Sequence, residues 1–497
     1  MSEKWPVALV LGVLLVVGMV HVGALRPGQD WGGDFAMYVA HARNLAEGRP
    51  YAETGYVYNP DYATVGPPTY PPVCPLLLAP VCLVYGPDLE AMKPVMIAAL
   101  LVFLLFVFLV LRKELPAGQA AAIVALVGLN RCFLGDANSI RSDLPFMAIL
   151  YAAIYVIQKA YGNPDADRPR PGCVLLAALL IVAAYGARTV GIVLLPSLLV
   201  YELVRYRRIT RWAVAATLLV GAVLAAKSVL VPGDTGYLDQ YDVGLGVFLQ
   251  NGMGYAAEFA AFWHNGYSKP IGAALFAAVT VLAVLGYVSS VRRRVTFLEI
   301  FPIFYVLAVL AFPGFAGRRY LQPIFPLYLF YAARGLQLAW LVDRPALRRA
   351  AVAAMLLAVA ATYAASFTNL QLDFAEGISR PESVALFDYV AQQTEADDVI
   401  VFIKPRVMAL LTSRRSAAYH MPDDDARLWE FFDRIGATHL VVVDSDEAMA
   451  LAESPERIEY LRAFARRNAA RLAPVFTNRD FSVYRIAEPT ALAQGAR

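Results

Sequence analysis

An acid, a histidine and two tyrosines stand close together in the stretch "GGDFAMYVAHARNLAEGRPY", residues 32–51, directly after an apolar N-terminal segment. The pattern predicts a helix that begins near Asp34 and ends at Gly48, because glycine commonly terminates helices. Helical spacing then places Asp34, Tyr38, His41 and Leu45 on one face. Aspartate is also favoured as a helix N-cap, but capping alone does not require Tyr38 and His41 on the same face.

A second acid, Asp143, lies in "NSIRSDLPF" at the start of a later apolar segment. It too has an N-cap interpretation, with Pro145 in the first turn. Two aspartates at the mouths of neighbouring membrane segments, amid positive side chains, suggest a cavity. In such a cavity a hydroxyl group would lose its proton and a phosphate would leave.

Positive side chains gather near the same ends of the apolar segments. They are Arg131, Arg141, Arg188, Lys269, Arg318 and Arg319, with Lys227 inside a segment. Taken singly, each is more often a side chain that reaches for the membrane interface. Several on one face favour a phosphate or pyrophosphate partner, and an ionisable residue inside a membrane is a functional candidate. We expect a lipid phosphate to bind Arg141, Arg188, Arg318 and Arg319 first, and Lys227 and Lys269 second.

The composition indicates a polytopic membrane protein. The 497 residues are 59% hydrophobic and 17% charged, more apolar and less charged than a soluble protein. A net charge of only +3 gives no support for a nucleic-acid partner, and the four cysteines have neither metal-ligand spacing nor the pattern of a disulfide framework. The first apolar run is interpreted as an uncleaved membrane span rather than a signal peptide.

About eleven apolar segments are long enough to be spans. They lie near 6–25, 92–111, 116–134, 143–159, 172–187, 189–204, 212–231, 271–290, 296–313, 320–341 and 350–367. Every second connection is rich in Lys and Arg, as in "RYRRITR" and "VRRR", and positive loops face the cytoplasm. The N-terminus is therefore expected inside, with the first long loop (26–91), residues 232–270 and the C-terminal part outside.

The C-terminal part, residues 370–497, is expected to be a small soluble α/β domain that follows a membrane domain of residues 1–369. "VIVFI" and "HLVVV" have the pattern of buried strands, and "FSVYRI" alternates like a final edge strand. We favour a packed extracytoplasmic cap for this domain. A role in binding the acceptor is the alternative.

Four short stretches, in this order and on this side of the membrane, resemble the GT-C glycosyltransferases that use polyprenyl-phosphate sugars. They are the acid-bearing first loop, "TYPPVCPLLLAPVCLVYG", "RSDLPF" and "RRYLQPIFPLYLFYAARGL". Within that group the chain is most similar to protein O-mannosyltransferases and to the bacterial aminoarabinose transferases of lipid A. Two departures stand out. Phe35 follows Asp34 where the family often has glutamate, and Tyr70 precedes the Pro-Pro pair where the family often has lysine or histidine.

The resemblance implies that Asp34 is the general base in an inverting displacement, with Asp143 as its supporting acid. A tyrosine at position 70 cannot supply positive charge to a donor phosphate, so that contact is expected elsewhere or not at all. We assign substrate binding to Tyr38, His41, Tyr58 and Tyr70, since aromatic side chains can stack on a sugar. The sequence does not decide whether a divalent cation takes part.

The predicted function is transfer of a sugar from a polyprenyl-phosphate donor to a lipid, glycan or protein acceptor. The reaction would take place on the outer face of a bacterial cytoplasmic (inner) membrane, among membrane lipids. A transporter or flippase of a lipid-linked glycan is the alternative. Transporters commonly show internal repeats and charged or broken helices near mid-membrane, whereas here the polar residues gather at one face.

Overall fold

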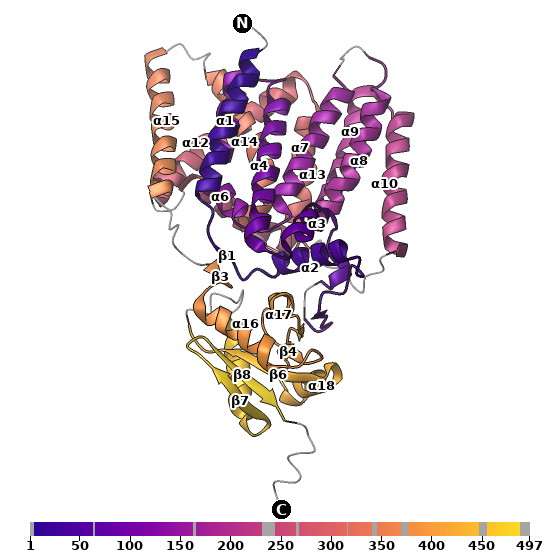
Figure 1. Ribbon diagram of the computed structural model, residues 1–497. Helices are drawn as coiled ribbons and strands as arrows, with labels where there is room; N and C mark the ends of the chain where they lie inside the picture. The colour runs from indigo at the N-terminus through magenta and orange to yellow at the C-terminus, as the bar shows by residue number, and fades with distance from the viewer. Residues whose placement is uncertain are drawn as a thin grey trace, which may run out of the picture. The chain divides into compact units, whose positions relative to one another are not determined.

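The computed structural model describes residues 4–62, 65–162, 166–230, 244–264, 268–315, 317–339, 345–368, 376–446 and 455–487. The chain forms two compact units from interleaved segments (Figure 1). The helical unit is built mainly from residues 1–25, 93–232 and 236–372, and the mixed unit mainly from 26–92 and 373–497. The first long loop therefore belongs with the C-terminal part, whereas we expected it within a membrane domain of residues 1–369.

Helices occupy every segment that the sequence predicts to be a span. They are α1 (Lys4–Gly23), α4 (Leu89–Leu111), α5 (Ala117–Gly128), α6 (Arg131–Ala137), α7 (Asp143–Ala160), α8 (Pro171–Ala187), α9 (Leu194–Tyr206), α10 (Arg211–Leu230), α12 (Lys269–Arg293), α13 (Phe297–Leu310), α14 (Phe325–Ala339) and α15 (Pro345–Thr368). A further helix, α11 (Leu245–His264), lies inside the expected outer loop 232–270.

Within the described residues, five helical stretches are long and apolar enough to cross a membrane, or six if the bent pair α5–α6 counts as one. The axes of that pair differ by 61°. Other apolar helices, such as α8 and α13, are shorter than a full span. The chain thus has the helices of a multi-pass membrane protein, and the count of about eleven spans stays a prediction.

Helix α7 is the most enclosed of the long apolar helices. In its apolar 18-residue stretch 78% of the residues are buried inside the protein, against 17% in α1. Its first residue is Asp143, so a polar group stands at the end of a helix that is otherwise packed inside protein. Helices α12 and α14 cross at Gly286 and Gly335. A Cβ atom on either glycine would lie 1.9 Å from a carbonyl oxygen of the other helix. Small residues at such a crossing allow this close approach.

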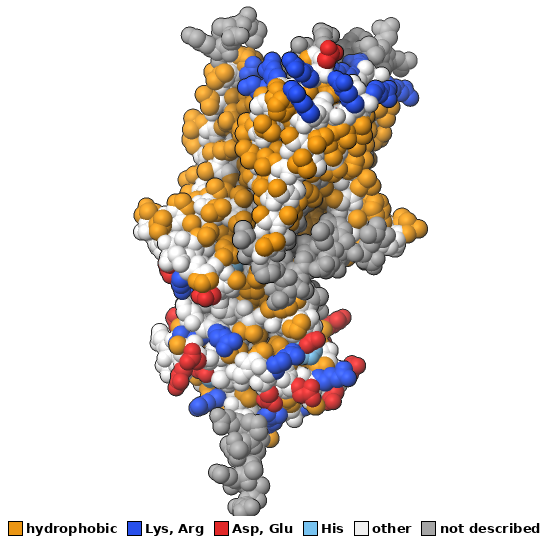
Figure 2. Space-filling view, turned by 90° about the vertical axis from the view of Figure 1, so that its right-hand side faces the viewer, with side chains coloured by type: hydrophobic (Ala, Val, Ile, Leu, Met, Phe, Trp, Pro, Cys, Tyr) orange, Lys and Arg blue, Asp and Glu red, His pale blue; other side chains and the backbone are white. Residues whose placement is uncertain are grey.

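Positive charge is unevenly distributed over the helical unit. Figure 2 shows Lys and Arg side chains gathered at one end of it, beside a broad hydrophobic surface. The connections after α9 and α12 carry exposed arginines, among them Arg207, Arg208 and Arg294. Asp143 lies at the opposite end of α7 from Tyr161, whose hydroxyl donates to Glu202 near the connection after α9, so Asp143 and this arginine-rich connection mark different ends of the helical unit.

The mixed unit is built on a six-stranded sheet in the order β2-β5-β4-β6-β8-β7. The strands are β2 (Tyr56–Val57), β5 (Arg415–Ala417), β4 (Val399–Val401), β6 (Ala437–Val443), β8 (Phe481–Ile486) and β7 (Leu472–Thr477). The first four are parallel to one another, and β8 runs antiparallel to both of its neighbours. The expectation that "FSVYRI" forms an edge strand is wrong. β8 lies between β6 and β7, and its buried Phe481 and Val483 pair with the buried end of β6.

Six helices complete the described part of this unit: α2 (Gly33–Glu47), α3 (Val73–Tyr85), α16 (Pro381–Gln393), α17 (Pro405–Thr412), α18 (Asp425–Ile435) and α19 (Pro455–Arg467). Two contacts explain why the first loop folds with the C-terminal part. Strand β2 extends the edge of the sheet at β5, and β1 (Gly28–Gln29) pairs with β3 (Glu376–Gly377). Trp31 then inserts its ring among Phe387, Phe402 and Phe481, with centroids 5.5–6.1 Å away.

Candidate active site

Asp34 is the second residue of α2, which begins at Gly33 with Gly32 as its N-cap. The N-cap interpretation of Asp34 is therefore wrong, although a carboxylate in the first helical turn still interacts favourably with the helix dipole. Its side chain keeps 40% of its surface exposed. The helix ends at Gly48 in the left-handed conformation (φ 67°), as the sequence predicts.

Tyr70 joins the predicted face of α2. Its hydroxyl donates a hydrogen bond of 3.1 Å to Oδ1 of Asp34. Its ring lies edge-on to Tyr38 (centroids 5.7 Å apart) and tilted to His41 (6.1 Å). Asp34, Tyr38 and His41 thus meet one partner, which comes from the segment just after the 3₁₀ turn Pro67–Thr69.

His41 is enclosed and neutral at ordinary pH. Burial lowers the pKa of the imidazole to about 4, against the opposite influence of the backbone carbonyls of Tyr51 and Pro67. Its Nδ1 lies 2.6 Å from the Tyr51 carbonyl oxygen, which must accept the proton, and its ring stacks on Tyr51 at 3.9 Å. His41 supports the fold of the loop around Asp34.

Arg406 completes this group, and no sequence pattern pointed to it. It lies in the first turn of α17, after Pro405. Its Nη1 donates a short hydrogen bond to the Tyr70 hydroxyl and lies 3.7 Å from Oδ1 of Asp34. The guanidinium also faces the rings of Tyr56 and Tyr70, each 5.3 Å away. Sequence reasoning missed Arg406 because it cannot tell which part of the chain packs on α2.

Tyr58 is half-buried in the segment that follows β2. Its ring carbons lie 3.7 Å from the point that a Cβ atom on Gly66 would occupy. By contrast, Tyr38 and Tyr70 are 5% and 2% exposed, and His41 is fully buried. Of the four residues assigned to substrate binding, Tyr58 therefore keeps the most accessible ring.

Asp143 forms the centre of a second group, in the helical unit. Ser142 is the N-cap of α7 and Asp143 its first residue, so the N-cap interpretation of Asp143 is also wrong. The carboxylate is 3% exposed and accepts hydrogen bonds from two arginines. Arg188 contacts Oδ1 closely, and Arg319 reaches Oδ2 with Nη2 at 2.8 Å and Nε at 3.2 Å.

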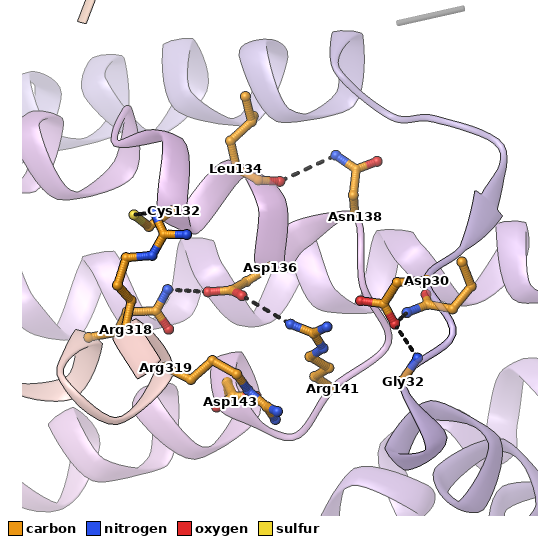
Figure 3. Close-up of polar contacts among 12 residues, drawn as sticks. Asp30, Gly32, Cys132, Leu134, Asp136, Asn138, Arg141, Asp143, Arg318 and Arg319 are labelled. Carbon is orange, nitrogen blue, oxygen red and sulfur yellow. Dashed lines mark hydrogen bonds and ion pairs between the residues drawn. The ribbon is translucent and has the colours of Figure 1, made fainter. Parts of the chain in front are cut away.

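Asp136, on α6, is a third acid that sequence reasoning missed. Gln322 donates a short hydrogen bond to its Oδ2, and Nη1 of Arg141 lies 3.8 Å from its Oδ1. Figure 3 shows Asp136 of α6, Arg141 of the segment between α6 and α7, Asp143 of α7 and Arg319 of the turn before α14 side by side. With its arginine and amide partners, the buried Asp136 joins Asp143 and Arg319 in one polar network.

Arg318 turns to other partners. It pairs with Glu258 of α11 at 3.4 Å and donates to the Cys132 sulfur at 3.7 Å. We refer to Asp136, Arg141, Asp143, Glu258, Arg188, Arg318 and Arg319 as the arginine cluster. Its four arginines face three carboxylates, so the cluster carries one net positive charge.

The two predicted lysines lie elsewhere on the helices. Lys227 is in the last turn of α10, with its ammonium 5.1 Å from the Tyr185 ring, and Lys269 opens α12 after the N-cap Ser268. In the described ranges, neither lysine pairs with a carboxylate of the arginine cluster. The same residues contain no group of three or more His, Cys, Asp or Glu side chains that could hold a metal ion.

No protein-family model and no curated protein matches this sequence. Solved structures do match. The chain superposes on ArnT from Cupriavidus metallidurans bound to undecaprenyl phosphate with a TM-score of 0.60 and 15% identity, covering 98% of this chain and 100% of that one. The Archaeoglobus fulgidus oligosaccharyltransferase tethered to an acceptor peptide gives a TM-score of 0.61 and 12% identity, covering 98% of this chain and 74% of that one.

A third structure is the A. fulgidus oligosaccharyltransferase AglB in complex with an inhibitory peptide and a dolichol-phosphate. It matches with a TM-score of 0.57 and 13% identity, over 89% of this chain and 70% of that one. The chain therefore has the GT-C fold of these membrane glycosyltransferases.

Proposed function

We propose that this protein is an inverting glycosyltransferase that moves a sugar from a polyprenyl-phosphate donor to an acceptor hydroxyl. The observation that carries the proposal is the state of Asp34. It is a partly exposed carboxylate, oriented by the Tyr70 hydroxyl, and it is not needed as a helix cap. The shared fold supports the donor class, because the ArnT and AglB structures hold undecaprenyl phosphate and dolichol-phosphate.

In the proposed reaction Asp34 takes the proton of the acceptor hydroxyl as the oxygen attacks the anomeric carbon of the sugar. A new carbon–oxygen bond forms, and the bond between that carbon and the phosphate oxygen breaks. The electron pair leaves with the polyprenyl phosphate. Attack opposite to the leaving group inverts the anomeric centre. A positioned base of this kind contributes about 10²–10⁴-fold.

The arginine cluster is our candidate for binding the donor phosphate. Arg188 and Arg319 are held in place by Asp143, so their guanidinium groups need little reorganisation when negative charge develops on the leaving group. The net positive charge of the cluster favours an anion. Asp143 then acts as a positioning residue for the arginines.

The aromatic residues around Asp34 receive revised roles. Tyr38, His41 and Tyr70 are buried against one another, so we assign them to positioning the base. Tyr58 remains the candidate for stacking on a sugar or acceptor. We further propose a bacterial cytoplasmic membrane, with the N-terminus inside and the mixed unit outside, because the arginine-rich connections lie away from Asp143.

The test uses the full chain in detergent, where transport across a membrane cannot be measured. Host membranes from a strain that lacks the gene supply polyprenyl-phosphate sugars and acceptors. Release of polyprenyl phosphate and the mass gain of the acceptor are followed by mass spectrometry. A glycosyltransferase produces both in detergent, and Asp34→Asn stops both. If the wild-type protein neither releases polyprenyl phosphate nor adds mass to the acceptor, it is not the proposed enzyme, and the transporter alternative gains support.

A further inference from the structure

Arg406 comes from the C-terminal part of the chain and contacts the proposed base directly. We infer that Arg406 is a positioning residue for Asp34, which it holds through the hydroxyl of Tyr70. This inference rests on the proposed function, since it presumes that Asp34 is the base. It gives the C-terminal part a task in the reaction beyond that of a packed cap.

The hydrogen bonds run in one direction. The Tyr70 hydroxyl has a single proton, which it donates to Oδ1 of Asp34. The hydroxyl oxygen of Tyr70 therefore accepts a proton from Nη1 of Arg406. Arg406 itself lies 3.7 Å from Oδ1. Hydrogen bonds in such a chain polarise one another. Because Tyr70 and Arg406 both contact Oδ1 of Asp34, they restrict rotation of its carboxylate.

The site is shaped to hold a guanidinium group. Arg406 is 13% exposed at its side chain and faces the rings of Tyr56 and Tyr70. A Cβ atom on Gly33 would lie 3.2 Å from Cδ and 3.3 Å from Nη1 of Arg406, so the missing side chain at Gly33 leaves room for it. A planar guanidinium stacks on aromatic rings in a way that a lysine ammonium does not.

The fold of the mixed unit explains how this residue reaches α2. Strand β4 is central in the sheet, and the chain leaves it through Phe402 into α17. Phe402 packs on Trp31, three residues before Asp34, and β2 holds Tyr56 at the sheet edge next to β5. Asp34 on α2 and Arg406 on α17 are therefore positioned by the same sheet, and both contact the Tyr70 hydroxyl.

The decisive experiment compares Arg406→Gln, Tyr70→Phe and Arg406→Lys in the detergent assay, using undecaprenyl phosphate as the probe of binding. We expect Arg406→Gln to lower kcat about tenfold or more, with binding of undecaprenyl phosphate changed less than about twofold. Tyr70→Phe should have a similar effect. Arg406→Lys keeps the charge and should restore part of the lost turnover.

The pH dependence separates positioning from a loss of folding. Among the ionisable side chains around Asp34, Tyr70 and Arg406 contact its carboxylate, and Tyr38 and His41 pack against the Tyr70 ring. A guanidinium beside a carboxylate favours its ionised form, so Arg406→Gln should move the acidic limb of the kcat/KM profile to higher pH. Arg406→Lys should leave that limb near its original position.

Arg414 provides the matched control. It is a half-buried arginine of the same region, and it donates to the carbonyl oxygens of Ala391 and Thr394 at 2.7 and 2.8 Å. Arg414→Gln should lower the thermal stability without moving the pH profile. If Asp34→Asn stops turnover but Arg406→Gln keeps wild-type kcat and pH profile, the positioning role is overturned and the proposed function stands. If Asp34→Asn itself keeps turnover, the base assignment fails.

Discussion

The two acids that the sequence singled out are held in opposite ways. Asp34 keeps 40% of its side chain exposed, and it contacts the Tyr70 hydroxyl and, at 3.7 Å, Arg406. Asp143 keeps 3% exposed and is closed between two arginines. A carboxylate that must accept a proton from a substrate needs access, whereas a carboxylate that must fix two cations needs enclosure. The difference supports our proposal that Asp34 is the base and Asp143 its supporting acid.

The strongest test of this contrast is the replacement of each acid by its amide. Asp34→Asn keeps the shape of the side chain, so any loss reports charge and basicity. We expect turnover to fall at least about 10²-fold, with donor binding retained, because a base is needed only in the transition state. Single-turnover kinetics of the purified chain give both values. A protein that keeps wild-type turnover shows that Asp34 is not the base.

Asp143→Asn should act on binding and folding instead. The change leaves two arginines without their shared carboxylate, and a hydrogen bond to a charged group is worth about 1.5–3 kcal/mol. We expect a lower melting temperature and altered affinity for undecaprenyl phosphate, with a smaller loss of kcat than in Asp34→Asn. Equal losses of kcat in the two variants would remove the distinction between base and support.

The arginine cluster can be divided by the same reasoning. Arg319 holds Asp143 with two hydrogen bonds, whereas Arg318 has half its side chain exposed and pairs with Glu258. Arg319→Ala should weaken binding of undecaprenyl phosphate about tenfold, and Arg318→Ala less, since exposed pairs are worth little. Binding can be measured by titration in detergent. If alanine at Arg141, Arg188, Arg318 and Arg319 together leaves the affinity within twofold, the phosphate binds elsewhere.

The sequence predicted the elements better than their partners. Hydrophobic runs located the helices because burial in lipid or protein needs apolar surface whatever the tertiary arrangement. Helical spacing correctly put Asp34, Tyr38 and His41 on one face, which Tyr70 then covers. Asp136 and Arg406 escaped prediction because each becomes informative only through a distant contact, with Gln322 in one case and Tyr70 in the other.

The division of the chain was harder to predict for the same reason. Two short strands, β1 and β2, attach the first loop to the C-terminal part. Each has two residues, which is too short for a period-2 pattern to be recognised. The signal that joins residues 26–92 to the sheet is therefore almost absent from the local sequence, although the contact determines where Asp34 is held.

The smallest expected effect distinguishes the two acids by pH. Asp143 is held by arginines, which stay charged throughout the accessible range, whereas Tyr70, the partner of Asp34, packs on the neutral His41. The folded pKa of His41, about 4, lies below the ordinary value of 6.5. Between these values the unfolded chain binds more protons than the folded one, so the free energy of unfolding falls as the pH falls.

From pH 7 to pH 5 this loss amounts to about 2 kcal/mol for the mixed unit. Thermal unfolding of the full chain in detergent measures it, with His41→Phe as the variant that cannot titrate. The wild-type melting temperature should drop more than that of His41→Phe over this interval. Both proteins share every other titrating group. An equal drop in melting temperature would therefore mean that His41 is not held neutral in the folded protein, and that burial against Tyr51 and Tyr70 does not lower its pKa.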